Sequence, residues 1–370
     1  MQNETRQPNT EQPKRRLSAH RVIWFLVFLL LVGLTLYAIT CRSDDFSKEK
    51  LGAMLRGASP FWIVCAFLCM FGFILFEAIS LRHLTTFLGH KRSFWRNTIY
   101  SSADIYFSAI TPSATGGQPA SAVFMLGDKI PGAVTTMVLL LNVMLYTVSL
   151  LVVGILCFLF CPAAYFSFSF PSRVLIVAGF LIQTLFVAAL LLLILKEKII
   201  LRVAGAGLTL LHRLHLLKDV EKRRESLHHM AEEYRECIHT FRNGKGVVFR
   251  VFLLNMMQRL CNIGVTLCIF LAIGGSPEQI REVLVTQGFV VLGANAVPIP
   301  GAVGVSDGLF LDGFRELIPD TACVEFLSRG ISFYVCLLFC GSIFLIATVG
   351  NAMRKRREHR GEHRKTDEKA

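Results

Sequence analysis

Two phrases of the form P-x-A-x-G lie far apart in the chain, at 112–116 and 300–304. Each follows an apolar segment, and each is too rich in Gly and Pro for a plain membrane-spanning helix. Broken backbone at membrane depth is tolerated only where protein or a water-filled cavity covers its N–H and C=O groups. Interruptions at corresponding places in two halves of a chain are typical of a transporter's substrate site. The paired phrases therefore predict where a site lies, and say less about what it binds.

The first phrase combines backbone breaks with neutral polar side chains. Pro112 and Pro119 cannot donate backbone hydrogen bonds. Gly116 and Gly117 permit backbone conformations closed to other residues and the close approach of a ligand. A half-helix that restarts near Gln118 would point unpaired N–H groups and its positive dipole end into a cavity, which suits a phosphate or a carboxylate. The candidate substrate-binding residues of this segment are Thr111, Pro112, Ser113, Thr115, Gly116, Gly117 and Gln118.

The second phrase is broken in the same way and adds an ionisable group. Ser306 and Asp307 are placed to cap a helix that restarts after the break. At membrane depth, Asp307 is also a functional-site candidate, because an ionisable side chain is costly there. The candidate substrate-binding residues of this segment are Pro300, Gly301, Gly304, Ser306 and Asp307. The alternative for both segments is a structural kink with close packing of small residues.

Two charged residues inside predicted crossings complete the candidate set. Glu77 precedes the basic residue Arg82 by about one helical turn, and Arg259 lies nine residues after Arg250. Both residues are expected to lie in the same half of the membrane, so a structural Glu77–Arg259 ion pair is feasible. The alternatives for Arg259 are a side chain that snorkels to the headgroup region and one that faces a lipid phosphate, whose oxygens match the guanidinium fork.

The elements that position these residues are predicted to be membrane helices. Hydrophobic residues make up 53% of the 370 residues and the mean hydropathy is +0.53, which is typical of a polytopic membrane protein. Apolar runs near the length of about 20 residues that spans a bilayer predict six crossings. These are 22–40, 60–81, 132–160, 174–195, 250–274 and 328–349. The first run is interpreted as a retained helix and not as a cleaved signal peptide.

Charge predicts the topology. Lys and Arg concentrate in 1–21, 82–97, 196–250 and 351–370, which places these segments and both termini in the cytoplasm of a multi-pass plasma-membrane protein. The phrase-bearing segments, about 98–130 and 279–316, must then be re-entrant and enter from opposite sides. The predicted fold class is an all-α polytopic bundle with an inverted repeat. The net charge of +13 is attributed to cytoplasmic loops beside anionic lipid, and not to nucleic acid.

The predicted organisation is a basic tail at 1–21, a transmembrane domain at 22–350 and a basic tail at 351–370. The domain carries a cytoplasmic helical insert at 196–246, in which apolar residues recur every seven positions. The stripe of the insert consists of Val220, Leu227, Tyr234 and Phe241, with Ala231 and Ile238 between them. This stripe either packs on the bundle or lies on anionic lipid.

No catalytic motif, cofactor fingerprint or metal-ligand spacing occurs in the sequence, so we predict no catalytic residues, no cofactor and no metal.

The segments 110–119 and 298–308 together resemble the lysylphosphatidylglycerol synthase transmembrane-region family, the flippase-like module of multiple peptide resistance factor proteins. The resemblance covers roughly 20–350. Ala302 and Asp307 stand where the family often has Gly and Glu, which keeps the small size and the charge. The resemblance implies movement of aminoacylated phospholipids, other phospholipids or polyprenyl-linked lipids between leaflets, and with it a role in antimicrobial peptide resistance.

Three functions stay open at this point. The first is a flippase for a membrane phospholipid such as lysylphosphatidylglycerol. The second is a membrane-embedded lipid-headgroup transferase, with Glu77, Asp104 and Asp307 as candidate acids or bases. The family label would be phosphatidylglycerol lysyltransferase, but the soluble synthase domain is expected to be absent, since the chain ends about 20 residues after the last crossing. The third is a scaffold. The expected partners are a phospholipid and a separate lipid-modifying enzyme, and the oligomeric state is not predicted.

Overall fold

The computed structural model describes residues 48–195, 232–241 and 243–367. The first predicted crossing at 22–40, the tail at 1–21 and most of the insert lie outside the described residues. The side chains of Ser113 and of 352–367 are likewise outside the description. In the described ranges every regular element is helical, which confirms the all-α class.

Five helical segments of the described chain are long and apolar enough to cross a membrane. They coincide with five of the six predicted crossings, because uninterrupted apolar runs of this length satisfy all backbone groups within the helix. Pro60 begins the first of them, where its missing N–H costs no hydrogen bond. The five segments are α3 (Pro60–Phe87), α6 (Gly132–Phe160), α8 (Phe170–Leu195), α11 (Lys245–Ala272) and the stretch Thr321–Asn351, which comprises α14 (Thr321–Arg329), the π-helix η4 (Gly330–Val335) and the first half of α15 (Cys336–Asp367).

The two phrase-bearing segments fold as helix–break–helix hairpins. The first hairpin consists of α4 (Phe94–Ile110), η1 (Pro112–Ala114) and α5 (Gly117–Gly127). The second hairpin consists of α12 (Ile280–Ala294), η3 (Pro300–Ala302) and α13 (Val305–Gly313), preceded by η2 (Pro277–Gln279). With 11 and 9 residues, α5 and α13 are too short to cross a bilayer.

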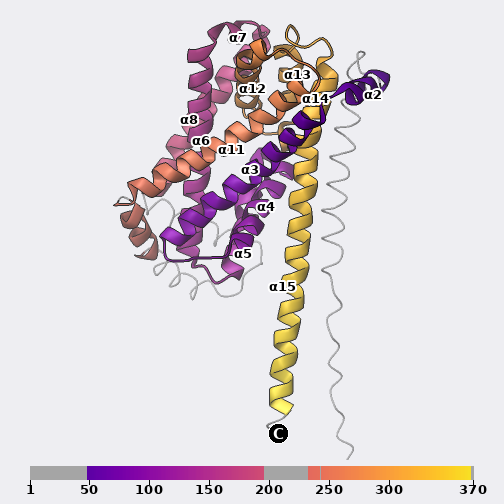
Figure 1. Ribbon diagram of the computed structural model, residues 1–370. Coiled ribbons are helices and arrows are strands. Elements are labelled where there is room, and N and C mark those ends of the chain that lie inside the picture. Colours follow the sequence, from indigo (N-terminus) through magenta and orange to yellow (C-terminus); the bar gives the residue numbers. More distant parts are fainter. Residues whose placement is uncertain (1–47, 196–231, 242, 368–370) are drawn as a thin grey trace, which may run out of the picture.

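The hairpins enter the bundle from opposite ends. In Figure 1 α4 and α5 lie toward the lower end of the bundle, whereas α12 and α13 lie toward the upper end. Their broken tips η1 and η3 contact each other, and η3 also contacts α4. Each hairpin is flanked by long helices, α3 and α6 for the first and α11 and α15 for the second. This arrangement is the inverted repeat that the sequence predicted.

The helix pair α3 and α11 makes the most extensive contact among the described elements. A buried hydrogen-bonded cluster joins this pair to α6: Ser80 Oγ donates to Asn142 Oδ1 at 2.7 Å, and Asn255 Nδ2 donates to Ser80 Oγ at 3.1 Å. Further along, Thr266 of α11 and Ser328 of α14 share a hydrogen bond of 2.7 Å. Interhelical polar contacts of this kind fix helix register where lipid offers no alternative partner.

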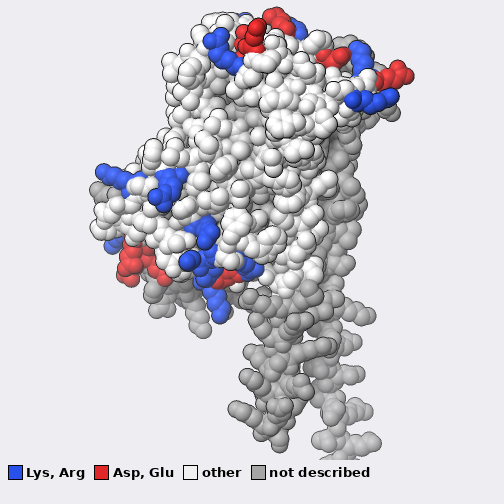
Figure 2. Space-filling view, viewed as in Figure 1, with Lys and Arg blue, Asp and Glu red and all other residues white. Residues whose placement is uncertain are grey.

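On the face shown in Figure 2, charged side chains gather toward the two ends of the bundle and leave a belt without charged residues between them. The candidate crossings expose apolar side chains such as Phe61, Leu159 and Leu185, each at least 66% accessible. An exposed apolar surface of this kind is favourable in contact with the hydrocarbon of a bilayer and unfavourable in contact with water. The helices α2 (Lys48–Gly57) and α7 (Pro162–Phe166) lie at the upper end in Figure 1.

The described part of the insert packs on the bundle. Residues 232–241 are helical, and Tyr234, Cys237 and Phe241 are buried. The Phe241 ring lies 5.3 Å from the Phe87 ring at the end of α3. This part of the stripe therefore follows the packing alternative, while Val220 and Leu227 fall outside the described residues.

Candidate functional site

A central cavity of about 630 Å³ lies beside the tip of the first hairpin. It is bounded by residues of α3, α4, η1, α5, α6, α8, α11, η4 and α15, together with Asn295 of the second hairpin. Its apolar walls carry a concentrated set of polar groups, as binding cavities usually do. These are Glu77, Asp104, Ser108, Thr115, Gln118, Asn142, Tyr146, Thr147, Gln183, Gln258, Asn262, Asn295 and Ser332.

Two carboxyl groups face each other in this cavity. Glu77 of α3 and Asp104 of α4 are 5% and 6% exposed, and their carboxyl groups interact electrostatically with each other. Gln118 Nε2 donates to Asp104 Oδ2 at 2.6 Å, and Ser108 Oγ donates to Asp104 Oδ1 at 3.1 Å. Gln258 Nε2 donates to Glu77 Oε2 at 3.1 Å. The pair is thus held by neutral donors from three other positions.

The glycines of the first phrase are required for close packing and not for unusual backbone angles. Gly116 has a φ of −82°, and Gly117 begins the helix α5. A Cβ on Gly117 would lie 2.0 Å from Ser108 Oγ and 2.1 Å from Asp104 Oδ1. The expectation that these two glycines supply special conformations is therefore wrong. The left-handed residue of this phrase is Ala114, with a φ of 54°.

The predicted anion site at the start of α5 is occupied by the protein's own carboxylate. Asp104 lies against Gly117, the first residue of this helix, and accepts from the Gln118 side chain. A carboxylate is stabilised at this end of the helix dipole. The remaining side chains of the phrase mainly brace the turn: the Thr111 hydroxyl accepts from Gly116 N at 2.9 Å, and the Thr115 hydroxyl donates to Pro112 O at 2.9 Å.

In the second phrase, Asp307 caps the restarting helix as predicted. Its Oδ2 accepts from Gly304 N at 2.8 Å, and Gly304 adopts a φ of 82°. Gly301, with a φ of 58°, and Ala302, with a φ of 50°, complete the left-handed turn. The third residue of both P-x-A-x-G phrases, Ala114 and Ala302, is thus left-handed, which makes the two breaks alike in backbone as well as in sequence.

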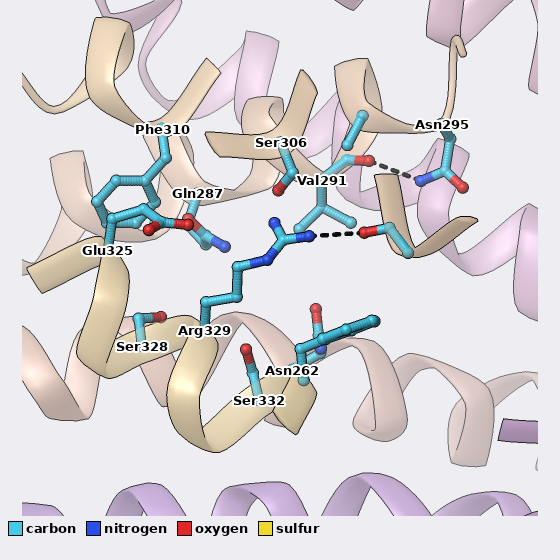
Figure 3. A pocket seen from close by; sticks show the side chains of 13 residues that line it. Asn262, Gln287, Val291, Asn295, Ser306, Phe310, Glu325, Ser328, Arg329 and Ser332 are labelled. Atoms are coloured by element: carbon cyan, nitrogen blue, oxygen red, sulfur yellow. Dashed lines mark hydrogen bonds between the residues drawn. The ribbon is translucent and has the colours of Figure 1, made fainter. Parts of the chain in front are cut away.

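Arg329 ties the second phrase to α14. Its guanidinium forms a 2.5 Å ion pair with Asp307 and donates to Gly301 O at 2.8 Å. In Figure 3 the Arg329 side chain reaches from α14 across a small cavity to this carbonyl oxygen. The small cavity measures about 170 Å³, and Ser306, Glu325 and Arg329 are among its lining residues. Glu325 also interacts electrostatically with both Asp307 and Arg329.

Sequence reasoning missed Arg329 and Glu325 as site residues. Glu325 precedes the predicted crossing 328–349, and Arg329 lies one residue inside it. The charge of Arg329 could have identified it from the sequence, since an arginine inside an apolar run is a candidate site residue.

Arg259 does not pair with Glu77. Within the described residues its guanidinium stacks over the Tyr146 ring at 4.0 Å from the ring centroid, and its Nε has no hydrogen-bond partner. The neighbouring residue Gln258 is the one that meets Glu77. Because Tyr146 lines the central cavity, Arg259 lies behind one aromatic ring of its wall.

The two cavities adjoin each other. Asn262, Asn295, Ser332 and Phe333 line both. The structure therefore brings Glu77, Thr115 and Gln118 to the central cavity and Gly301 and Ser306 to the small one. Asp307 borders the small cavity through Arg329, while Thr111, Pro112, Gly116, Gly117, Pro300 and Gly304 shape the breaks. No group of three or more His, Cys, Asp or Glu side chains in the described ranges is placed to hold a metal ion.

These features define a polytopic α-helical membrane protein with two opposed re-entrant hairpins around a polar interior. The chain belongs to the lysylphosphatidylglycerol synthase TM region family, whose model matches residues 21–340. It is also similar to a UPF0104 membrane protein of Archaeoglobus fulgidus, with 29% identity over 100 residues. That similarity covers 27% of this chain and 30% of the relative, so it supports the membrane class and no finer assignment.

Proposed function

We propose that this protein moves a phospholipid with an ammonium-bearing headgroup, such as lysylphosphatidylglycerol, between the two leaflets of the plasma membrane. The observation that carries the proposal is the central cavity of about 630 Å³, whose apolar walls carry polar groups and two carboxyl groups beside the tips of two opposed hairpins. Inverted repeats with broken helices at such a site are typical of alternating-access transporters.

The wall formed by α8 supports entry of a lipid from the side. Gln183, Phe186 and Leu190 of this helix line the central cavity, and Phe186 is also 44% exposed on the outer surface. α8 is the least buried of the five candidate crossings. A headgroup can therefore pass α8 and enter the cavity while its acyl chains stay in hydrocarbon, which avoids the cost of moving the chains through a polar site.

The charge of the cavity supports an ammonium group as the recognised element. Glu77 and Asp104 receive hydrogen bonds from Gln258, Gln118 and Ser108, all of which are neutral. Buried carboxylates without a cation favour a positively charged ligand. Arg259, behind the Tyr146 ring, is a positively charged candidate to balance a lipid phosphate.

Reconstitution into vesicles tests the function. Tail-labelled lysylphosphatidylglycerol should become accessible in the opposite leaflet at a rate proportional to the amount of protein present. In the double variant Glu77→Gln, Asp104→Asn this rate should be at least tenfold lower. The matched control is Glu316→Gln, which neutralises an exposed acid at the end of the bundle. Appearance of a new lipid species would favour the headgroup transferase. Absence of translocation by the parent protein would overturn the proposal.

We further propose that the end of the bundle bearing Arg82, Lys91, Arg92 and Arg96 faces the cytoplasm, with both termini on that side. The support is the excess of Lys and Arg there, which contrasts with the mixed acids and bases of the other end. A separate lipid-modifying enzyme that supplies the lipid to this protein stays a candidate partner.

A further inference from the structure

Glu77 and Asp104 bring two carboxyl groups into the same part of the central cavity. Both are nearly fully buried, they interact electrostatically with each other, and their hydrogen-bond donors, Gln258, Gln118 and Ser108, are neutral. Two like charges in contact at low dielectric repel strongly, which is why paired carboxyl groups in other proteins share a proton. This repulsion favours a state in which the pair holds one proton and carries one negative charge.

No Lys or Arg side chain of the described residues neutralises the pair in place of this proton. Among the described residues, no Lys or Arg forms an ion pair with Glu77 or Asp104. Arg259 stacks on Tyr146, which itself interacts electrostatically with Glu77 and Asp104. The titratable and charged groups that interact with the pair or stand next to it are Tyr146 of α6, Arg259 of α11 and Cys336 and Cys340 of α15.

Two amide oxygens beside the pair point to a ligand that brings donors. The side-chain NH₂ groups of Gln258 and Gln118 each donate a hydrogen bond to a carboxylate. The Oε1 atom of each side chain has no hydrogen-bond partner among the described residues. Gln258 is 2% exposed, and both residues line the central cavity. A buried acceptor without a donor is costly, so a ligand with several N–H donors and a positive charge would satisfy this set of oxygens.

We propose that the Glu77–Asp104 pair exchanges its shared proton for the ammonium group of the headgroup, so that each lipid crosses one way as a proton crosses the other way. This inference rests on the proposed function. The exchange balances: as the ammonium group approaches the carboxylates, the O–H bond of the shared proton breaks and the proton leaves to water in the cavity. One positive charge has replaced another, and the net charge of the site is unchanged.

A pH gradient across vesicles tests the coupling. Lysylphosphatidylglycerol carries two ammonium groups and one phosphate, so its exchange for a proton is electroneutral. With the membrane potential clamped by potassium and valinomycin, a gradient of one pH unit should enrich the tail-labelled lipid about tenfold in the leaflet on the acidic side, because one unit is a tenfold ratio of protons. Glu77→Gln and Asp104→Asn should each abolish the enrichment, whereas Glu316→Gln should retain it.

The outcomes separate the two proposals. Translocation that ends with equal lipid in both leaflets despite the gradient would overturn proton exchange and leave the flippase function standing. Loss of all translocation in the parent protein would overturn the flippase function instead.

Proton release can also be measured without transport. Infrared difference spectra of the purified protein should show loss of a protonated-carboxyl band when dodecylammonium is added. The band change should be missing in Glu77→Gln and present in Glu316→Gln. An unchanged protonated-carboxyl band in the parent protein upon dodecylammonium binding would contradict the exchange.

Discussion

At the scale of single residues, the two P-x-A-x-G phrases use small side chains for different physical reasons. In the first phrase, Gly117 lies against Asp104 and Ser108, so the residue is small because another side chain needs the space. In the second phrase, Gly301 and Gly304 adopt positive φ angles that disfavour other residues. The sequence pattern shows that small residues are needed, and only the structure shows which constraint applies.

Gly117→Ala should therefore displace the Asp104 carboxylate. The added Cβ would lie within 2.6 Å of three atoms of Ser108 and Asp104, and overpacking of this kind costs about 1–3 kcal/mol. We expect a lower unfolding temperature and loss of translocation. Gly127→Ala, in the last residue of the same helix, is the matched control, because its Cβ would meet nothing within 4 Å. Equal effects of the two substitutions would show that the packing argument is wrong.

Ala302 offers the opposite test, since its left-handed backbone is strained in the native protein. With a φ of 50°, alanine at this position carries a penalty of about 1–2 kcal/mol that glycine lacks. We expect Ala302→Gly to be neutral or stabilising, and Ala302→Val to lower the thermal unfolding midpoint in detergent. A clear loss of stability in Ala302→Gly would refute the strain assignment.

At the scale of elements, the second hairpin is held by one buried ion pair between α13 and α14. The Arg329 guanidinium bonds both the Asp307 carboxylate and the Gly301 carbonyl, so it fixes the turn from two sides. Removing one partner of a buried pair leaves an uncompensated charge, which costs about 3–5 kcal/mol. We expect Arg329→Gln to be strongly destabilising and the double variant Asp307→Asn, Arg329→Gln to recover part of the loss.

The exposed pair of Lys50 and Asp320 serves as the control for that cycle. Its N–O distance is 3.1 Å, but both side chains are more than a third exposed, and solvent screens the attraction. Lys50→Gln should change chemical unfolding by less than the Arg329 substitution does. If both substitutions had the same small effect, the Arg329 pair would not be what holds the hairpin.

A second element contact should respond to acid. Burial raises the pKa of Asp312, but hydrogen bonds from Ser172 and Ser169 and the nearby Arg315 outweigh it and hold the pKa below its ordinary value. A lowered folded-state pKa contributes stability that is present above the unfolded-state value of about 4 and is lost as the pH falls through the folded-state pKa.

Asp312 joins α13 to the residue before α8, so its protonation should loosen this contact. The unfolding temperature of the parent protein should fall between pH 5 and pH 3 more steeply than that of Asp312→Asn. Parallel curves for the two proteins would show that Asp312 does not contribute.

At the scale of the whole molecule, the architecture was predictable and the side-chain partners were not. Apolar runs and Pro–Gly breaks identify the five described crossings and both hairpins, because helix formation in lipid depends on those local properties. Which of two adjacent residues meets Glu77 depends on helix rotation, since neighbours on a helix point about 100° apart. In the structure Gln258 contacts Glu77 and Arg259 stacks on Tyr146. The spacing of residues in the sequence does not predict which of the two neighbours makes which contact.

Orientation in the membrane is the remaining whole-molecule prediction, and it follows from the distribution of charge. Asn243 is exposed at the basic end beside the start of α11, and Glu278 is exposed at the other end in η2. A membrane-impermeant maleimide applied to intact cells should label Glu278→Cys at once and Asn243→Cys only after permeabilisation, with the parent protein giving the background from its own cysteines. Labelling of Asn243→Cys alone in intact cells would reverse the orientation, and the basic end would then face outward against the positive-inside bias.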